Sequence, residues 1–341
     1  DVLVNDDFDT FINISSGIND LNDYIYFSYE SDKITINKKI NLELPRLSHK
    51  TFYLSDLIDS YTEKGTIKVT QPKQNLFFGR ILAGIQNKKT RSFSANHSYY
   101  DSSKTKEYFT NDTSYRVYPF FPDQINKISM YPIMSESNLE IELKIYMKNN
   151  RQITDIYNLK SPSAKPLHIN INQIAEKNNV ELIDIDTFSI FAKNKDGNAP
   201  TRINHQLIYG SKLVNNPLSS SINVSLMNDD VFKAKNKTSH IWGQLLSSDS
   251  YESKLGLNFI NPDGNSSDVE LEFYNSSGLI NTFKKKLYPK KTLTIESSDI
   301  ISKNDNVDFI WYIAKSKRSD LSAFFSHTNI FSGNSSGDHT F

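Results

Sequence analysis

The fold is decided by the segment Asp268–Pro289, which reads DVELEFYNSSGLINTFKKKLYP. Apolar and polar residues alternate through VELEFYN and LINTFKKKL, and the central NSSG has the composition of a tight turn. The segment therefore predicts two short β-strands on either side of a turn. It has a close match in Glu140–Pro162, EIELKIYMKNNRQITDIYNLKSP, and a weaker match in Tyr24–Pro45.

The matches continue along the chain in the same order. In each segment a tyrosine lies thirteen residues before a leucine, and a strand-like stretch with a histidine follows further downstream. The tyrosines are Tyr29, Tyr146 and Tyr274, and the histidines are His97, His205 and His327. Repetition at a fixed period indicates a repeated fold, so we interpret the chain as three copies of a unit of about 110 to 120 residues.

Each copy is expected to be an antiparallel β-sandwich. The third copy contains short runs rich in β-branched and aromatic residues, separated by turns such as NPDGNSSD (Asn261–Asp268). The predicted class is all-β, with three tandem sandwiches of about seven strands each. Their boundaries are 1–112, 113–237 and 238–341. The second has an insert near 213–237, in which Ser220–Met227 alternates like one additional strand.

The first copy lacks a counterpart of the opening strand, which begins at Thr113 in the second copy and at Thr238 in the third. DVLV at the start of the chain could substitute for it through a shortened connection. A sandwich without one strand exposes an edge that invites a strand from another chain. We therefore expect head-to-tail assembly through strand donation at the chain ends, which would build a filament. The assembly residues are predicted to be Val2, Leu3, Val4, Phe11, Phe331 and Phe341.

Composition argues against several classes of function. Lys plus Arg and Asp plus Glu are both 39, so bulk charge does not favour nucleic acid or an anionic membrane as a partner. No apolar run is long enough to span a bilayer, and no membrane insertion is expected. Cysteine is absent, which excludes disulfides, thiol catalysis and Cys-ligated zinc. The chain begins at Asp1 without a signal peptide, as a processed secreted protein does, although a trimmed chain would look the same.

The sequence contains no recognisable motif for catalysis or for a cofactor. There is no G-x-S-x-G elbow, and the twelve glycines form no phosphate-binding loop. The matched histidines belong to different copies, so we interpret them as structural residues that hydrogen-bond a turn. The Asx-rich turns lack the spacing of an EF-hand. We therefore expect no enzyme activity, no metal site and no cofactor.

Aromatic stretches leave a second class of function open. HSYYD (from His97), YFTNDTSYRVYPFF (from Tyr108) and FIWYIAK (from Phe309) carry side chains that could stack on sugar rings. Tyr and Trp at alternate strand positions more often form the core and a partly covered outer face. An exposed, coplanar set of Tyr and Trp on one sheet would favour sugar binding, whereas strands shared between chains would favour assembly.

The third copy carries, in order, W…QLL, LNFINP, VELEFYNSSG, KLYP and FIWYIA between Trp242 and Ala314. This order resembles the tandem Ig-like β-sandwich repeats of secreted and surface proteins of bacteria, although the second copy has MYPIM in place of the Asn-Pro strand. The resemblance implies an extracellular or cell-surface array and transfers no catalytic residue. The expected function is a non-enzymatic structural or assembly protein that self-associates. The alternatives are a carbohydrate-binding or adhesive module with a polysaccharide partner, and a viral fibre or capsid-associated protein.

Overall fold

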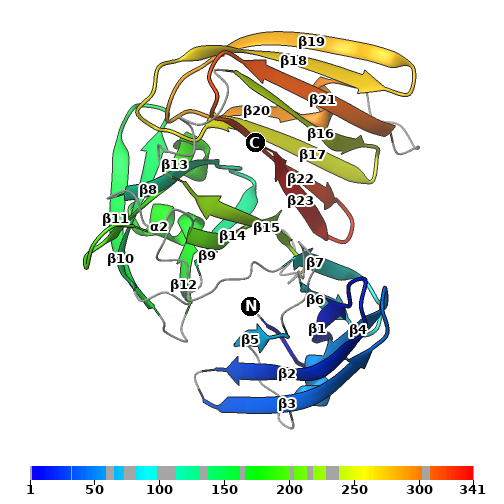
Figure 1. Ribbon diagram of the computed structural model, residues 1–341. Helices are drawn as coiled ribbons and strands as arrows, with labels where there is room; N and C mark the ends of the chain where they lie inside the picture. The colour runs from blue at the N-terminus through cyan, green and yellow to red at the C-terminus, as the bar shows by residue number, and fades with distance from the viewer. Residues whose placement is uncertain are drawn as a thin grey trace. The chain divides into compact units, whose positions relative to one another are not determined.

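The computed structural model describes residues 2–31, 33–58, 65–72, 81–97, 113–130, 137–161, 166–199, 203–212, 218–227, 238–301 and 308–340. Strands dominate these residues and form six sheets, so the predicted all-β class is confirmed (Figure 1). Contacts divide the chain into two compact units, 1–101 with 164–166 and 102–163 with 167–341. No helix in the described part is long and apolar enough to cross a membrane.

The first unit holds one sandwich, in which the sheets β4-β1-β6-β7 and β3-β2-β5 enclose a core. Ile25 and Phe27 point into this core and Tyr24 and Tyr26 point outward, because successive side chains of a strand face opposite sides. The elements are β1 (Phe8–Ser15), β2 (Leu21–Glu30), β3 (Thr35–Leu44), β4 (His49–Tyr53), α1 (Leu54–Leu57), β5 (Thr66–Thr70), β6 (Leu82–Asn87) and β7 (Phe93–His97).

The second unit begins with the second sandwich, built from the sheets β11-β10-β13-β8 and β12-β9-β14-β15. Leu143 and Ile145 of β10 and Leu207 of β14 are among its fully buried core residues. The elements are β8 (Thr113–Pro119), β9 (Gln124–Met130), β10 (Ser137–Met147), β11 (Gln152–Ser161), β12 (Leu167–Asn170), α2 (Ile171–Lys177), the 3-10 helix η2 (Leu182–Asp184), β13 (Ile185–Asn194), β14 (Ile203–Ser211) and β15 (Ser220–Leu226).

The third sandwich belongs to the same unit and consists of the sheets β16-β21-β18-β19 and β20-β17-β22-β23. Leu271 and Phe273 of β18 and Leu255 and Leu257 of β17 are buried in its core. The elements are β16 (Ser239–Ser247), β17 (Tyr251–Phe259), β18 (Ser267–Asn275), β19 (Gly278–Leu287), β20 (Leu293–Glu296), the 3-10 helix η3 (Ser297–Asp299), β21 (Asp308–Ser316), β22 (Leu321–Asn329) and β23 (Ser335–Thr340).

The second and third sandwiches have the same strand order, with eight strands each in the described part of the chain. Strand β15, expected to be an extra strand of an insert, takes the edge position that β23 takes in the third sandwich. It is therefore a regular member of the fold. In the first sandwich, the described residues place no strand beside β5, where β8 and β16 lie in the others. Only a bridge between Val2 and Gly65 lies there, with N–O distances of 2.9 and 3.3 Å.

A shared register relates the three sandwiches. In each of them the residue that caps a short helical turn is also the last paired residue of the preceding strand. The capping residues are Tyr53, Asn170 and Glu296, and their partners in the ladder are Phe11, Lys127 and Lys254, respectively. Phe11, Lys127 and Lys254 therefore occupy the same position on β1, β9 and β17.

This register corrects the alignment of the histidines. His327 pairs with Ser253, one residue before Lys254, whereas His205 pairs with Met130, three residues after Lys127. The two histidines are thus four residues out of register, and His97 lies on β7, a different strand of the fold. The expectation that the three correspond was wrong, because similar spacing in sequence concealed loops of different length between β13 and β14 and between β21 and β22.

The matched tyrosines also differ between copies. Tyr146 and Tyr274 lie on the outward faces of β10 and β18, but Tyr29 is buried in the first core. A shift of one residue turns a side chain to the opposite face of a sheet. The weaker match of the first copy therefore preserves the strand and changes the side that its tyrosine occupies.

Candidate interaction surface

Val2, Leu3 and Val4, three of the predicted assembly residues, form the first segment of the first sandwich. Val2 and Val4 are buried in its core. Between them, the backbone N–H of Leu3 donates to Thr10 Oγ1 at 2.8 Å, and the same hydroxyl donates to Leu3 O at 2.9 Å. Donation of this segment to another chain would require it to leave that core. Strand donation stays a prediction.

The other predicted assembly residues have more varied surroundings. Phe11 faces outward from β1 and packs edge-to-face on Phe93, with ring centroids 6.0 Å apart. Phe331 lies 76% exposed in the turn between β22 and β23. Phe341 lies outside the described residues. The segment that precedes it, β23, pairs with β22 of its own sandwich along its whole length.

Two of the histidines have the hydrogen bonds of structural residues. His205 is buried, with Nδ1 3.1 Å from Ile203 O and Nε2 2.6 Å from the Tyr118 hydroxyl. Burial lowers the pKa of His205 to about 3 and that of His327 to about 4, so both are neutral near pH 7. His327 Nδ1 lies 2.7 Å from Ser253 Oγ. The described residues contain no group of three or more His, Asp or Glu that could hold a metal.

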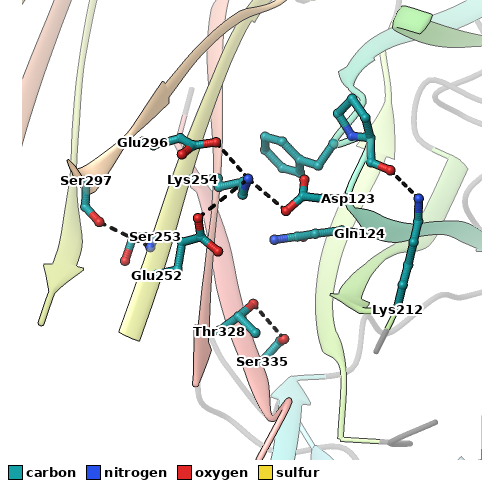
Figure 2. A network of polar contacts seen from close by, with 12 residues as sticks. Asp123, Gln124, Lys212, Glu252, Ser253, Lys254, Glu296, Ser297, Thr328 and Ser335 are labelled. Carbon is teal, nitrogen blue, oxygen red and sulfur yellow. Dashed lines mark hydrogen bonds and ion pairs between the residues drawn. The ribbon is translucent and has the colours of Figure 1, made fainter. Parts of the chain in front are cut away.

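A network of charges joins the second and third sandwiches (Figure 2). The Lys254 ammonium of β17 lies 2.8 Å from Asp123, in the turn before β9, and 2.8 Å from Glu296 of its own sandwich. Glu252 is more distant, at 3.9 Å. Burial acts to lower the pKa of Lys254, but its hydrogen bonds to Asp123 and Glu296 outweigh burial and raise it. Lys254 is therefore a charged residue of the joint between the two sandwiches.

Apolar packing completes this joint. Phe324 of β22 is fully buried and belongs to the core cluster of the second sandwich, with its ring 5.8 Å from that of Tyr118. The buried Arg116 guanidinium lies 5.3 Å from the Phe324 ring and donates to Ser322 Oγ at 2.9 Å. A Cβ on Gly256 would lie only 2.4 Å from Pro119 Cβ, so glycine allows β17 this close approach. The third sandwich thus closes one side of the second.

Residues of the third sandwich also pack along the outward face of β8 and β13. Val117, Thr187 and Ser189 point outward on these strands and are 0% exposed. Ile260, in the loop after β17, packs with Tyr115 and Met227 at the margin of this face. In the loop before β20, Lys291 pairs with Asp186 at 2.7 Å and Lys290 lies 5.8 Å from the Tyr146 ring. Two loops and one sheet of the third sandwich therefore seat on the second.

The equivalent face of the third sandwich is uncovered and aromatic. Trp242 of β16 and Trp311 of β21 are 69% and 44% exposed, and they are the two tryptophans of the chain. Phe309 stacks beside Trp311 with centroids 6.4 Å apart, and Tyr274 of β18 pairs with Trp311 in the ladder. We call this surface, defined by Trp242, Tyr274, Phe309 and Trp311, the tryptophan face.

Polar side chains border the tryptophan face. Lys315 pairs with Glu272 at 2.8 Å, and the Tyr274 hydroxyl donates to the other Glu272 oxygen at 2.9 Å. The hydrogen bond from Lys315 lowers the pKa of Glu272, which keeps the carboxylate charged. An open hollow of about 330 Å³ lies between Trp242, Tyr274, Trp311 and Ile313. The face can therefore offer aromatic surface together with fixed hydrogen-bonding groups.

Sequence reasoning identified only part of this surface. The stretch FIWYIAK is conspicuous for its aromatic residues, and alternation places Trp311 outward and Tyr312 in the core. Trp242 lies in the predicted opening strand of the third copy, which gives no reason to expect a functional role for it. The signal that was available is the alternation of β16, where Ile241 and Leu245 are buried and Trp242 is not.

Comparisons with known proteins identify no family. No family model and no curated protein sequence matches the chain. Among solved structures, dimeric latent PorU from Porphyromonas gingivalis is similar at 9% identity and a TM-score of 0.20, over 98% of this chain and 29% of that chain. The M60 catalytic domain with the CBM51-1 and CBM51-2 domains from Clostridium perfringens ZmpB is similar at 7% identity and a TM-score of 0.14, over 94% and 55%. The chain thus spans less than two thirds of either structure.

Proposed function

We propose that this chain is a non-enzymatic, extracellular or cell-surface assembly protein that self-associates through faces of its β-sandwiches. The observation that carries the proposal is the tryptophan face. Exposed apolar surface of this kind is uncommon on a monomer and marks a site of interaction. Tryptophan and tyrosine are also the residues that most often dominate the energy of protein interfaces.

The joint between the second and third sandwiches supports self-association over other partners. In this joint, one sandwich of the chain already packs against another on the side formed by β8 and β13. The face that is covered in the second sandwich is uncovered in the third. Another sandwich of the same fold is therefore the partner that we expect to bind the tryptophan face.

Sedimentation velocity of the full chain at increasing concentration tests the proposal. Wild type should form species larger than the monomer, and Trp242→Ser with Trp311→Ser should shift that association to at least about tenfold higher concentration. Both side chains are exposed, so the variant should keep its fold, which circular dichroism checks. Wild type that stays monomeric at every concentration contradicts the proposal. Ile156→Ser, which removes an exposed aliphatic side chain of β11, is the matched control.

Carbohydrate binding is the second candidate, and the tryptophan face is also the observation that favours it. An aromatic ring presents a negative face that attracts the C–H groups of a pyranose, while Glu272 and Gln244 lie on the same face of the sheet and carry groups that bond hydroxyls. A glycan array with wild type and the double tryptophan variant tests this function. Binding of a polysaccharide by wild type that is lost in the variant, with no self-association of either, would favour the second candidate.

A further inference from the structure

The register of the second and third sandwiches identifies equivalent residues on their outward faces. Ile190 pairs with Leu143 and Arg116, and Ala314 pairs with Leu271 and Ile241. Leu143 and Leu271 hold the same place in the matched segments of the sequence. By this register, each of three outward residues of the second sandwich has a counterpart in the third. The counterpart of Val117 is Trp242, that of Thr187 is Trp311, and that of Ser189 is Ile313.

The covered positions of the second sandwich therefore carry larger apolar side chains in the third. Val117, Thr187 and Ser189 are fully buried on the face where Ile260 and Lys290 of the third sandwich pack, whereas their counterparts Trp242, Trp311 and Ile313 are more exposed. The side of the fold that receives a neighbour is the same in both. This places the receiving half of a sandwich joint on the third sandwich.

The inserting half of the same joint recurs on the first sandwich. In the third sandwich it consists of Phe324 on β22, the loop after β17 and the loop before β20. The shared register makes Leu82 of β6 the counterpart of Phe324, because Asn13 pairs with Leu82 as Gly256 pairs with Phe324. Leu82 is 41% exposed.

Two exposed residues in the equivalent loops extend this surface. Ile18, after β1, is 61% exposed, and Leu47, before β4, is 77% exposed. The loops touch, since the Leu47 N–H donates to Gly17 O at 2.8 Å. Leu47 lies six residues before Tyr53, the N-cap of α1, and Lys290 lies six residues before Glu296, the N-cap of η3. Both Leu47 and Lys290 have left-handed φ values, of 55° and 59°. We call Ile18, Leu47 and Leu82 the aliphatic patch.

Leu47 has a left-handed backbone conformation that is uncommon for leucine. A bulky residue at positive φ is strained relative to asparagine or glycine, and a leucine there is also exposed to water. In the third sandwich, the counterpart Lys290 contacts the Tyr146 ring of the neighbouring sandwich. Tyr146 corresponds to Tyr274, which lies on the tryptophan face.

We infer that copies of this chain join head to tail, with the aliphatic patch of one copy seated on the tryptophan face of the next, in the manner in which the third sandwich seats on the second. The inference rests on the proposed function and specifies its two surfaces. Each copy keeps one surface of each kind free, so the contact is heterologous and propagates. Leu47 of one copy then lies against Tyr274 of its neighbour.

Cross-linking between single-cysteine variants tests this pairing, because the chain has no cysteine of its own. Full-length Leu47→Cys and Tyr274→Cys proteins are mixed under mild oxidation, with a size tag on one of them. A disulfide-linked heterodimer should form at least about tenfold faster than in a mixture of Leu47→Cys with Ile156→Cys. Equal rates in the two mixtures contradict the inference.

Surface variants distinguish failure of the inference from failure of the proposed function. Ile18→Ser with Leu47→Ser and Leu82→Ser removes the aliphatic patch, and the double tryptophan variant removes the other face. Each variant alone should be monomeric where wild type assembles, and an equimolar mixture should stop at a heterodimer. If the patch variant still self-associates like wild type, the inference is wrong and the proposed function stands. If wild type itself is monomeric, both are wrong.

Discussion

His205 should make the stability of the second unit depend on pH. Its pKa is about 3 in the folded protein and about 6.5 when unfolded, so below pH 6.5 the unfolded chain binds the proton first. The free energy of unfolding is therefore highest above pH 6.5 and decreases as the pH falls. At pH 5 the loss attributable to His205 is about 2 kcal/mol, from about 1.4 kcal/mol per pH unit. Denaturant titrations at pH 7, 6 and 5 measure it.

The control variants isolate this histidine. His205→Gln cannot titrate, so it should reduce the pH dependence while lowering stability at every pH through changed packing. His240→Gln makes the same substitution at an exposed histidine and is the matched control. An unaltered slope in His205→Gln would show that His205 is not the titrating group. His327, with a pKa lowered to about 4, accounts for part of the slope that remains.

At the scale of an element, β23 should be needed for a stable second unit. It pairs with β22, and the Ser335 N–H donates to Leu218 O of the second sandwich at 3.0 Å. Gly337 also lies close against Ser220 of β15. Deletion of Gly333–Phe341 removes several backbone hydrogen bonds and uncovers part of the joint, so it should cost at least about 3 kcal/mol. Thermal unfolding should show a midpoint lower by about 6 °C or more.

Phe331→Ser is the matched control for this deletion. Phe331 lies exposed in the turn that leads to β23, and a substitution there should change stability by less than about 0.5 kcal/mol. If the truncated chain is as stable as wild type, β23 is dispensable and its segment is free to pair elsewhere, as strand donation requires. The outcome therefore bears on the role of the chain end as well as on its stability.

Elements were easier to predict than their partners. The alternation in Asp268–Pro289 located β18 and β19, because the period of a strand is a local property. The pairing of β15 with β14 was not predictable, since a ladder depends on residues far apart in the chain. The histidine alignment failed because the loops before β14 and β22 differ in length, which the spacing of the histidines in the sequence does not reveal. Alternation separates the two faces of a strand but does not tell which face is covered by a neighbouring sandwich. The exposure of Trp242 and Trp311 therefore depends on the tertiary structure and could not be predicted from the sequence.

At the scale of the molecule, the second and third sandwiches should unfold together. Phe324, on β22 of the third sandwich, is a core residue of the second sandwich. Lys254 of the third sandwich also forms an ion pair with Asp123 of the second. Loss of either sandwich would expose the joint on the other, so the cost of separate unfolding is high. The described part of the first unit has its own core, from Val2 to Ile81, and should unfold in a separate transition.

Native-state hydrogen exchange of the full chain checks this coupling. Amides of β9 and β14 should lose protection at the same denaturant concentration as those of β17 and β22. Phe324→Ala, which should cost about 3–5 kcal/mol, should split this event in two because it removes the shared side chain. Phe273→Ala truncates a residue of the same size that lies wholly within the third core, and it should lower stability while keeping the event single. Separate events in wild type would mean that the joint is a weak contact, and the third sandwich could then no longer serve as the template for contacts between copies.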